Sequence, residues 1–569
     1  MLLLKRCLPA WLQHYQSHWL AGDLTAGIVV TLLLLPQSLA YALLAGLPVQ
    51  AGLYASVAPL LVYACSGRSP AQSVGPMALT SLLTAATLAR FAQAGTPDYQ
   101  LLAVWLALLS GLMLLAMGLA RLGFVADLLS EPVLAAFTTA SALLIVLSQL
   151  GPLAGLRFPG SSLPQWLAGF WQQLPHWQPA TLAVGLAALG WLLAVRRWGA
   201  QLLRRLGVPS LPSQLLLRGA PLLAMFVGMG LARGGLLLPV VGSVPAGLPV
   251  VALPHIALSQ LADLALPAFF IALVNYVQSL SVAQLLAARR QESVDPDREL
   301  VALGLCNMAA GLAGGFPVAG GLSRSVVNAD AGANSQLASL VTAGGMLLVM
   351  CTATGALASL PLPVLSATII ASLLGMLELR TLRRAWLAER ADAVAWLLTF
   401  VLVLLLGVDS GIVAGVLVSL ATLLWRSSRP HIAEVGRLPG SHHFRNRQRH
   451  AVETLPGVLL LRVDESLYFG NARQVRQALL ERVALVAGTQ QLVLIMSAVN
   501  RVDTTALSML ENLDQALQQA GVTLHLAEIK GPVADILQRA GLGLRFDGRV
   551  HLSTQAAWQS LAGLPDYHI

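Results

Sequence analysis

The chain alternates long runs of apolar residues with short polar segments over its first three-quarters. Fourteen apolar segments can be marked between Leu24 and Trp425, several of them short. A helix needs roughly 20 apolar residues to cross a bilayer, so the pattern predicts a polytopic α-helical membrane protein. The predicted spans lie near residues 24–45, 50–66, 75–90, 100–120, 131–150, 179–195, 219–236, 262–287, 299–315, 321–331, 335–355, 358–377, 391–407 and 409–425.

After Trp425 the pattern becomes that of a soluble domain. Residues 428–450 are basic and punctuated by Gly and Pro, which predicts a linker. Within residues 451–569, three short apolar runs are typical of buried strands, and two segments of helical periodicity separate them; the strands are expected at 457–463, 491–497 and 522–529. This alternation predicts a small α/β domain. Thr504 is the expected N-cap of its second helix.

Composition agrees with a membrane protein and excludes some other classes. The chain is 56% hydrophobic and only 11% charged, whereas about a quarter of an ordinary soluble domain is charged. The only lysines are Lys5 and Lys530, and neither lies in a phosphate-binding loop, which excludes a P-loop ATPase. The four cysteines have no paired spacing, so we expect neither a metal site nor a cofactor, and nothing in the sequence predicts an enzyme.

The positions of the basic residues predict the orientation. If residues 1–20 are cytoplasmic, eighteen basic residues fall on the cytoplasmic side of the membrane segments and three fall outside. This bias is typical of cytoplasmic loops, so we expect a multi-pass protein of the cell inner (plasma) membrane with both termini in the cytoplasm. No signal peptide is evident. The pI near 9.9 then reflects topology and does not indicate nucleic-acid binding.

A polar pair recurs at equivalent places in two apolar segments. QSLAYALLA begins at Gln37 in the first predicted span, and QSLSVAQLLA begins at Gln278 in the eighth, 241 residues later. Fourteen spans divide into two sevens, and an odd number in each half places the halves in opposite orientation. The sequence therefore predicts a 7+7 inverted repeat, the architecture of many secondary transporters.

Two Pro/Gly-rich stretches occupy a second pair of equivalent positions. SVGPMALTS (73–81) opens the third span and PVAGGLSRS (317–325) opens the tenth, and each precedes a segment too short to cross. A helix that begins within the membrane directs its unpaired N–H groups and the positive end of its dipole at the cavity, which favours an anion. Gln37 and Gln278 would line the walls of this site and donate hydrogen bonds.

Arg324 is the strongest single indication of a site, because it lies inside a predicted membrane segment, whereas the other basic residues are assigned to loops. Structural alternatives stay open for each candidate. Arg324 could pair with Asp330 or with helix carbonyls, Ser323 could cap the tenth helix, and Tyr41 could simply pack. Gln37 and Gln278 could form hydrogen bonds between helices without contacting a substrate.

At this point the residues resemble a known family. GDLTAGIVVTLLLLPQSLAYALLAGLPVQAGLYASVAPLLVYACSGRS, SVGPMA, VGSVPAGLP, ELVALGLCNMAAGLAGGFPVAGGLSRSVVNADAGA and the terminal VNRVDTTAL together are similar to the SulP (sulfate permease) anion transporters, which are related to prestin. The resemblance covers nearly the whole chain. It implies a core domain that moves against a gate domain within residues 21–427, a cytoplasmic STAS domain over residues 451–569, and a homodimer.

The resemblance also implies an anion site between the starts of the third and tenth spans. Its candidate residues are Gln37, Tyr41, Met77, Ala78, Gln278, Ser323 and Arg324. Many prokaryotic relatives have an acidic residue where this chain has Gln278, so proton symport is not expected. The protein is expected to run as an exchanger or a uniporter, with uptake that does not depend on an inward proton gradient beyond the effect of membrane potential. In the STAS domain, Asp503 and Thr504 replace the D-S pattern of signalling relatives, which makes Thr504 a candidate regulatory phosphoacceptor.

These observations favour secondary transport of a small anion by alternating access, with sulfate as the family default and bicarbonate, chloride or a dicarboxylate as rivals. Other partners would be a coupling ion or counter-anion, membrane lipid, and a cytoplasmic regulator bound to the STAS domain. Two alternatives have different observable consequences. A nucleobase transporter of the same architecture would use acidic residues in the eighth and tenth spans, and a membrane-anchored STAS regulator would transport nothing.

Overall fold

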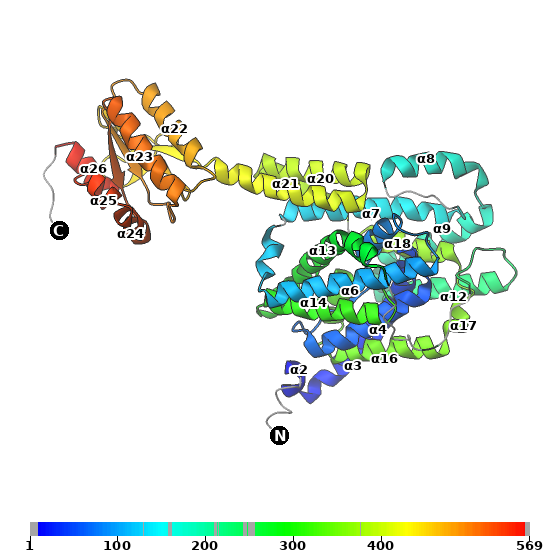
Figure 1. Ribbon diagram of the computed structural model, residues 1–569. Coiled ribbons are helices and arrows are strands. Elements are labelled where there is room, and N and C mark those ends of the chain that lie inside the picture. Colours follow the sequence, from blue (N-terminus) through cyan, green and yellow to red (C-terminus); the bar gives the residue numbers. More distant parts are fainter. Residues whose placement is uncertain are drawn as a thin grey trace. The chain divides into compact units, whose positions relative to one another are not determined.

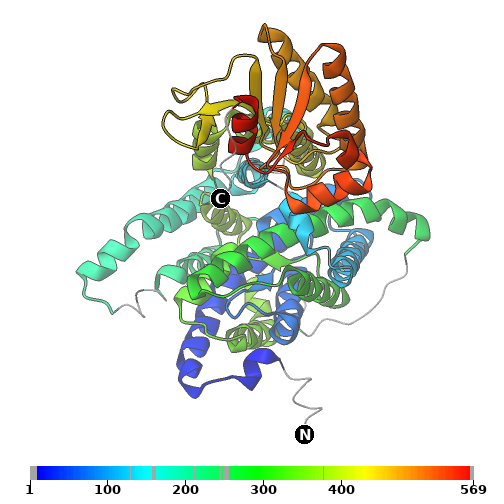
Figure 2. The ribbon, with the colours of Figure 1, turned by 90° about the vertical axis from the view of Figure 1, so that its left-hand side faces the viewer.

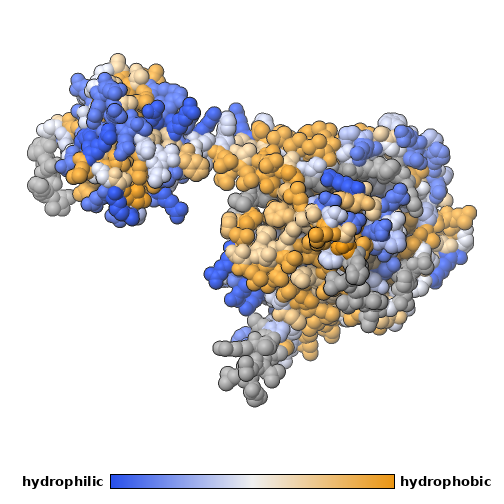
Figure 3. Space-filling model, viewed as in Figure 1, coloured by the Kyte–Doolittle hydropathy of each residue, from blue (hydrophilic) through white to orange (hydrophobic). Residues whose placement is uncertain are grey.

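The computed structural model describes residues 9–128, 130–156, 162–209, 213, 216–242, 247, 256–375 and 377–563. The chain divides into two compact units, Met1–Ser419 and Leu420–Ile569. On the face shown in Figure 3, hydrophobic residues cover much of the first unit, and hydrophilic residues predominate on the second. This contrast agrees with a membrane unit followed by a soluble domain.

The first unit is a bundle of helices (Figure 1). Its described elements are α2 (Ala10–Gln13), η1 (Ser17–Trp19), α3 (Leu20–Leu44), α4 (Val49–Ser66), β1 (Val74–Gly75), α5 (Ala78–Leu88), α6 (Pro97–Leu119), η2 (Gly123–Leu128), α7 (Glu131–Leu153), α8 (Leu163–Gln173), η3 (Leu174–His176), α9 (Pro179–Ala194), η4 (Val195–Gly199), α10 (Ala200–Arg205), α12 (Ala220–Arg233), α13 (Leu258–Arg290), α14 (Pro296–Leu312), β2 (Ala319–Gly320), α15 (Leu322–Asp330), α16 (Leu337–Thr352), α17 (Thr354–Leu357), α18 (Leu362–Leu373), α19 (Leu379–Ala388) and α20 (Arg390–Leu406). The boundary between the units falls within α21 (Val408–Ser428).

Each of the fourteen predicted apolar segments contains a helix. These are α3, α4, α5, α6, α7, α9, α12, α13, α14, α15, α16, α18, α20 and α21. Among the described residues, six helices are long and apolar enough to cross a membrane by length and composition, and several others are shorter apolar helices. The polytopic helical fold is confirmed, whereas the number of crossings stays a prediction.

Small residues allow close pairing of α6 and α14, which contact each other extensively. A Cβ added to Gly111 of α6 would lie 2.8 Å from the backbone oxygen of Gly304, and one added to Gly304 of α14 would lie 2.7 Å from the backbone nitrogen of Leu115. Such close approach of backbones is a common means of helix association where lipid removes the hydrophobic driving force. At its start, α14 is fixed by the N-cap Asp295, whose side chain accepts from the backbone N–H groups of Asp297 and Arg298.

The second unit contains one mixed six-stranded sheet, drawn with its helices in Figure 2. Its strand order is β4-β3-β5-β6-β7-β8, with parallel pairing from β5 to β8. Its elements are β3 (Ile432–Arg437), β4 (Phe444–Asn446), β5 (Val458–Val463), α22 (Ala472–Leu485), β6 (Gln491–Ile495), α23 (Thr504–Gln519), β7 (Thr523–Ala527), α24 (Gly531–Arg539), α25 (Leu542–Arg545), β8 (Val550–His551) and α26 (Thr554–Leu561).

Alternating residues of the central strands divide between two cores. Leu459, Leu461 and Leu494 pack with α22 and α23, whereas Leu460 and Val493 pack with Trp558 of α26. This arrangement confirms the predicted α/β domain and the three predicted strands, which are β5, β6 and β7. A parallel strand covered on both faces reads as a continuous apolar run, which is why these three were visible in the sequence.

Two sequence predictions about this unit need correction. Residues 428–450 are not simply a linker, because β3 and β4 lie within them and β3 pairs with β5. These two strands lie at one side of the sheet, in the order β4-β3-β5. The N-cap of α23 is Asp503 and not Thr504, since the Asp503 carboxylate accepts from the N–H of Ala506 at 2.8 Å.

Candidate functional site

A short two-stranded ribbon brings the two halves of the first unit together. β1 pairs with β2 in antiparallel register, with Val74 opposite Gly320 and Gly75 opposite Ala319. The N–H of Gly321 donates to the Ser73 carbonyl at 3.1 Å, and the N–H of Ser73 donates to Ser325 Oγ at 2.9 Å. The two Pro/Gly-rich stretches identified in the sequence are therefore directly hydrogen-bonded to each other.

Two short helices begin where this ribbon ends. α5 has 11 residues and α15 has 9, which at 1.5 Å per residue is about half the thickness of a bilayer core or less. Neither helix has a side-chain hydrogen bond at its N-cap, Met77 for α5 and Gly321 for α15. Uncapped N–H groups and the positive ends of two helix dipoles thus lie beside the ribbon.

Buried amides and hydroxyls of α13 and α14 hold the ribbon in place. Asn307 of α14 both donates to the Val318 carbonyl at 3.0 Å and accepts from the Val318 N–H at 2.9 Å. Ser279 Oγ of α13 accepts from the Gly320 N–H at 2.7 Å. These residues are at most 1% exposed. The supports are neutral, so they position the ribbon without adding charge to the site.

Arg324 lies in the first turn of α15 with its side chain only 2% exposed. Its Nη1 donates to the Pro76 carbonyl at 2.7 Å, and neither Nε nor Nη2 has a hydrogen-bond partner among the described residues. A Cβ added to Gly321 would lie 2.9 Å from Nε and Nη2, and one added to Gly75 would lie 3.5 Å from Nη2. Glycines therefore make room for a guanidinium whose Nε and Nη2 have no hydrogen-bond partner among the described residues. Buried donors of this kind are normally satisfied.

The first and eighth predicted spans flank this region, as the sequence suggested. α3 contacts α5 and α15, while α13 contacts α5, α15 and β2. Gln37 of α3 is 7% exposed, and Gln278 of α13 is half-buried with an Oε1 that has no hydrogen-bond partner among the described residues. Tyr41 is 8% exposed and packs in the same apolar cluster as Ala78.

The remaining candidates lie at the two helix starts. Met77 is the N-cap residue of α5 and is half-buried, and Ala78 is its first helical residue, 4% exposed. Ser323 is exposed in the first turn of α15. The structure thus brings together the elements that carry all seven candidates. That these residues contact the substrate stays a prediction.

Two of the structural alternatives are not observed. Asp330 pairs with Arg289, at 3.3 Å, and not with Arg324. Ser323 does not cap α15, because Gly321 occupies the N-cap position. Arg324 does donate to a backbone carbonyl, that of Pro76, but through only one of its three guanidinium nitrogens.

Two buried carboxylates, Asp23 and Glu299, were not identified from the sequence. Asp23 of α3 accepts from the N–H of Asn334 at 2.6 Å and from the N–H and hydroxyl of Ser335, at 3.0 and 2.6 Å. Glu299 of α14 accepts from Tyr63 and Gln72. Both lie near the ends of predicted spans, and packing against segments far away in the chain buries them.

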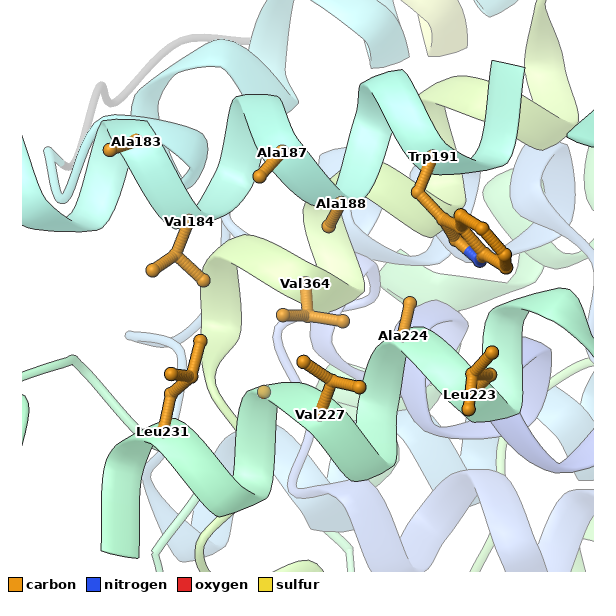
Figure 4. Close-up of a pocket in the computed structure, with 11 residues that line it drawn as sticks. Ala183, Val184, Ala187, Ala188, Trp191, Leu223, Ala224, Val227, Leu231 and Val364 are labelled. Atoms are coloured by element: carbon orange, nitrogen blue, oxygen red, sulfur yellow. The ribbon is translucent and has the colours of Figure 1, made fainter. Parts of the chain in front are cut away.

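A pocket outside this region has a different character. It lies between α9 and α12 with one wall from α18, and Figure 4 shows side chains such as Val184, Trp191, Val227 and Val364 around it. The lining is almost entirely aliphatic, with no charged side chain. Such a surface cannot compensate an anion for lost water, so it is not a candidate for the anion site.

In the second unit, Thr504 is the first residue of α23 and is exposed. The neighbouring Asp503 caps the helix and also accepts from the N–H of Phe469 at 2.8 Å. Thr504 is therefore accessible while the cap does not depend on it. Within the described residues, no group of three His, Cys, Asp or Glu side chains is placed to hold a metal ion.

Comparison with known proteins identifies the family. Residues 20–399 match the Sulfate permease family and residues 449–557 match the STAS domain. The chain is 36% identical to a probable sulfate transporter of Mycobacterium tuberculosis, over 93% of each chain. It is 35% identical to human solute carrier family 26 member 6, over 84% of this chain and 65% of that one.

Solved structures agree with this assignment. A structure of SLC26A9 superposes with a TM-score of 0.86 at 25% identity, covering 97% of this chain and 92% of the other. The transmembrane domain of a cyanobacterial bicarbonate transporter superposes with a TM-score of 0.59, over 72% of this chain and 98% of the other, and at 22% identity it supports the fold alone.

The chain belongs to the sulfate permease family, and it is a membrane protein with a C-terminal STAS domain. Its relatives support anion transport as its function and do not favour the nucleobase-transporter alternative.

Proposed function

We propose that the protein carries a small anion, with sulfate as the first candidate, by alternating access, and that the anion binds between the N-termini of α5 and α15. The observation that carries this proposal is the buried guanidinium of Arg324, which has two nitrogens without partners beside two uncapped helix ends. A buried charge without a counter-charge is costly. A bound anion would offset that cost and accept the unused hydrogen bonds.

The other candidate residues complete the proposed site. Gln37 and Gln278 would donate amide hydrogens from the two walls, and Ser323 would donate its hydroxyl. Met77, Ala78 and Tyr41 would limit the size of the cavity and reduce its water content, which strengthens the electrostatic interactions within it. Because the site is built from both halves of the inverted repeat, rocking of one domain against the other would open it to alternate sides.

The names of the relatives support sulfate as the first candidate, and bicarbonate, chloride and dicarboxylates remain rivals. We place the protein in the inner (plasma) membrane with both termini in the cytoplasm, since the basic residues favour that orientation. We further propose a homodimer and a regulatory STAS domain that binds a cytoplasmic partner.

A competition panel on purified protein in proteoliposomes tests this function. Radiolabelled sulfate uptake is measured at a clamped membrane potential with excess unlabelled sulfate, bicarbonate, chloride, succinate or uracil outside. Inhibition by one class of anion identifies the substrate, and a labelled form of that anion then confirms uptake. Competition by uracil would favour the nucleobase alternative, and absence of flux for every labelled compound would favour a membrane-anchored regulator.

A further inference from the structure

Glu299 is a carboxylate held in the interior of the first unit. It is the fourth residue of α14 and is 1% exposed. The Tyr63 hydroxyl of α4 donates to both carboxylate oxygens, at 3.0 and 3.1 Å, and Gln72 Nε2 donates to Oε1 at 3.0 Å. Its described hydrogen-bond partners therefore come from two other segments, and both are neutral.

No counter-charge for this carboxylate is found in the described part of the chain. The adjacent Arg298 pairs with Asp295 at 3.1 Å and is exposed, and Arg68 of the loop after α4 is also exposed. The nearby Asp297 adds no positive charge, and its carboxylate accepts from the N–H of Gly123 at 2.8 Å. The hydroxyl of Tyr276 of α13 is a neutral donor, and it donates to the Gly123 carbonyl at 2.7 Å.

Within the part of the chain that the structure describes, Tyr63 and Cys306 are the titratable groups that interact with Glu299. Neither carries positive charge. A buried carboxylate is normally paired with a cation or a metal ion, so at Glu299 the ion that can neutralise the charge is a proton.

Gln72 connects this carboxyl group to the candidate anion site. It directly precedes Ser73 and β1, and a Cβ on Gly320 of β2 would overlap its Nε2. Its backbone carbonyl accepts from Gln336 Nε2 at 3.3 Å. Glu299 is therefore one side-chain hydrogen bond away from the ribbon that positions the starts of α5 and α15.

The same glutamine can satisfy either protonation state of Glu299. With the carboxylate ionised, its Nε2 donates, as observed, and its Oε1 is buried without a hydrogen-bond partner among the described residues. A protonated carboxyl group must instead donate a hydrogen bond, and rotation of the amide by half a turn would present Oε1 to accept it. The unused oxygen is thus the acceptor that the protonated state requires.

We propose that Glu299 is the proton-binding site of the transport cycle, and that it takes up one proton when the anion binds and releases it when the anion leaves. Uptake forms one O–H bond on Glu299 with a proton drawn from water, release breaks that bond and returns the proton to water, and one positive charge moves with each anion. The rotation of Gln72 transmits the change to the ribbon. This inference rests on the proposed anion site. It departs from the expectation of uptake independent of a proton gradient that was drawn from Gln278, because it assigns coupling to a group outside the eighth span.

The test uses full-length protein in proteoliposomes with the potential clamped by valinomycin and with a pH-sensitive dye in the lumen. A first arm measures uptake of the labelled anion that the competition panel selects, without a pH gradient. Absence of uptake in this arm would refute the proposed function and not the proton site. In a second arm, an inward proton gradient should accelerate wild-type uptake severalfold, and the lumen should acidify in proportion to the anion delivered.

Glu299→Gln should abolish both effects, leaving uptake that no longer varies with the gradient. Asp330→Asn, which removes an exposed carboxylate from the same unit, should keep them. Uptake by wild-type protein without proton entry would overturn the proposal, as would proton-coupled uptake by Glu299→Gln.

A binding measurement covers the case in which Glu299→Gln does not fold. Calorimetric titration of wild-type protein with the selected anion, in two buffers of different ionisation enthalpy, reports the protons taken up on binding. We expect about one proton per anion for wild type, and Tyr63→Phe should shift the pH at which uptake of that proton is half complete. Identical heats in the two buffers would overturn the proposal.

Discussion

Arg324 and Pro76 join the two halves of the membrane unit at the point where both short helices begin. Nη1 of Arg324, in the first turn of α15, donates to the carbonyl of Pro76, two residues before α5, at 2.7 Å. The residues are 248 positions apart. One hydrogen bond therefore orients a positive charge between two helix ends and leaves the other guanidinium nitrogens available.

The first prediction concerns this charge. Arg324→Ala should reduce anion uptake roughly 10- to 100-fold, because a charge-assisted hydrogen bond contributes about 1.5–3 kcal/mol. Uptake into proteoliposomes measures the effect, with size-exclusion profile and thermal stability as checks on folding. Arg289→Ala, which removes an exposed arginine paired with Asp330, is the matched control. Equal uptake by wild type and Arg324→Ala would remove Arg324 from the site.

A second prediction concerns the glycines around the guanidinium. Gly321→Ala would place a Cβ 2.9 Å from Nε and Nη2 of Arg324, so the side chain would have to move and uptake should fall about tenfold. Gly75→Ala would place its Cβ 3.5 Å away, which is ordinary contact, so the loss should be smaller. Initial uptake rates of the two variants measure the difference. A larger loss in Gly75→Ala would contradict this account of how Arg324 is positioned.

A third prediction concerns the eighth span. Gln278→Glu should make uptake depend more steeply on external acid than it does in wild type. The ionised side chain would repel the bound anion by about 4 kcal/mol at 4 Å and an intermediate effective dielectric, whereas its protonated form would be a neutral donor. Uptake is measured at several external pH values with the potential clamped. Gln278→Met, which removes the amide without adding charge, should weaken uptake without adding this dependence. A Gln278→Glu profile parallel to that of wild type would place the residue away from the anion.

A fourth prediction concerns the boundary of the STAS domain. Removing residues 430–569 should leave the membrane unit folded, since it has its own cores, but should reduce transport or dimer stability if the domain is regulatory. A cut at residue 451 should give less soluble protein, because it would leave β3 and β4 without β5 and expose a strand edge. Full uptake and unaltered dimerisation after the first deletion, with light scattering as the readout, would leave the domain without a role in transport.

The same assays test Thr504. Thr504→Asp should leave the domain as stable as wild type, because Asp503 provides the cap of α23. A change in uptake would then reflect the added negative charge, as expected for a phosphoacceptor. Thr505→Asp, at the adjacent exposed position, is the control, and an equal effect from both variants would argue against a specific site.

A fifth prediction concerns the pH dependence of stability in the second unit. His525 lies between Gln491 Oε1, 2.8 Å from its Nε2, and His551 Nε2, 3.1 Å from its Nδ1. Burial, together with the charges that His551 and Arg549 can carry, lowers the pKa of His525 to about 4. The unfolded chain would take up this proton near pH 6.5, before the folded domain does.

The stabilising contribution is therefore complete above about pH 6.5 and is lost as the pH falls towards 4. We expect a loss of about 2 kcal/mol in the free energy of unfolding over that interval. Urea titrations of the separate domain at several pH values measure it, with His450→Gln, at an exposed position, as the control. A His525→Gln domain that loses as much stability as wild type between pH 6.5 and 4 would contradict the assignment.

By itself, the sequence determined which segments are helical and which strands are buried, because hydrophobic periodicity is a local property of the chain. It also identified the two Pro/Gly-rich openings and the recurrence of Gln37 and Gln278, since residues with special backbone or solvation requirements are conspicuous in an apolar run. Arg324 was recognised for the same reason: a charge inside a membrane segment is costly and therefore informative.

Only the tertiary structure decided what these residues contact. Asp330 was an available partner for Arg324 in the sequence, yet it pairs with Arg289, while Arg324 bonds a carbonyl 248 positions away. The strands β3 and β4 are visible only through pairing, β3 with β5 and β4 with β3. Glu299 was not singled out in the sequence, because its partners Tyr63 and Gln72 are more than 220 positions away in the chain. Burial and pairing arise between segments far apart in the chain, and no local pattern encodes which neutral or charged group will meet a given side chain.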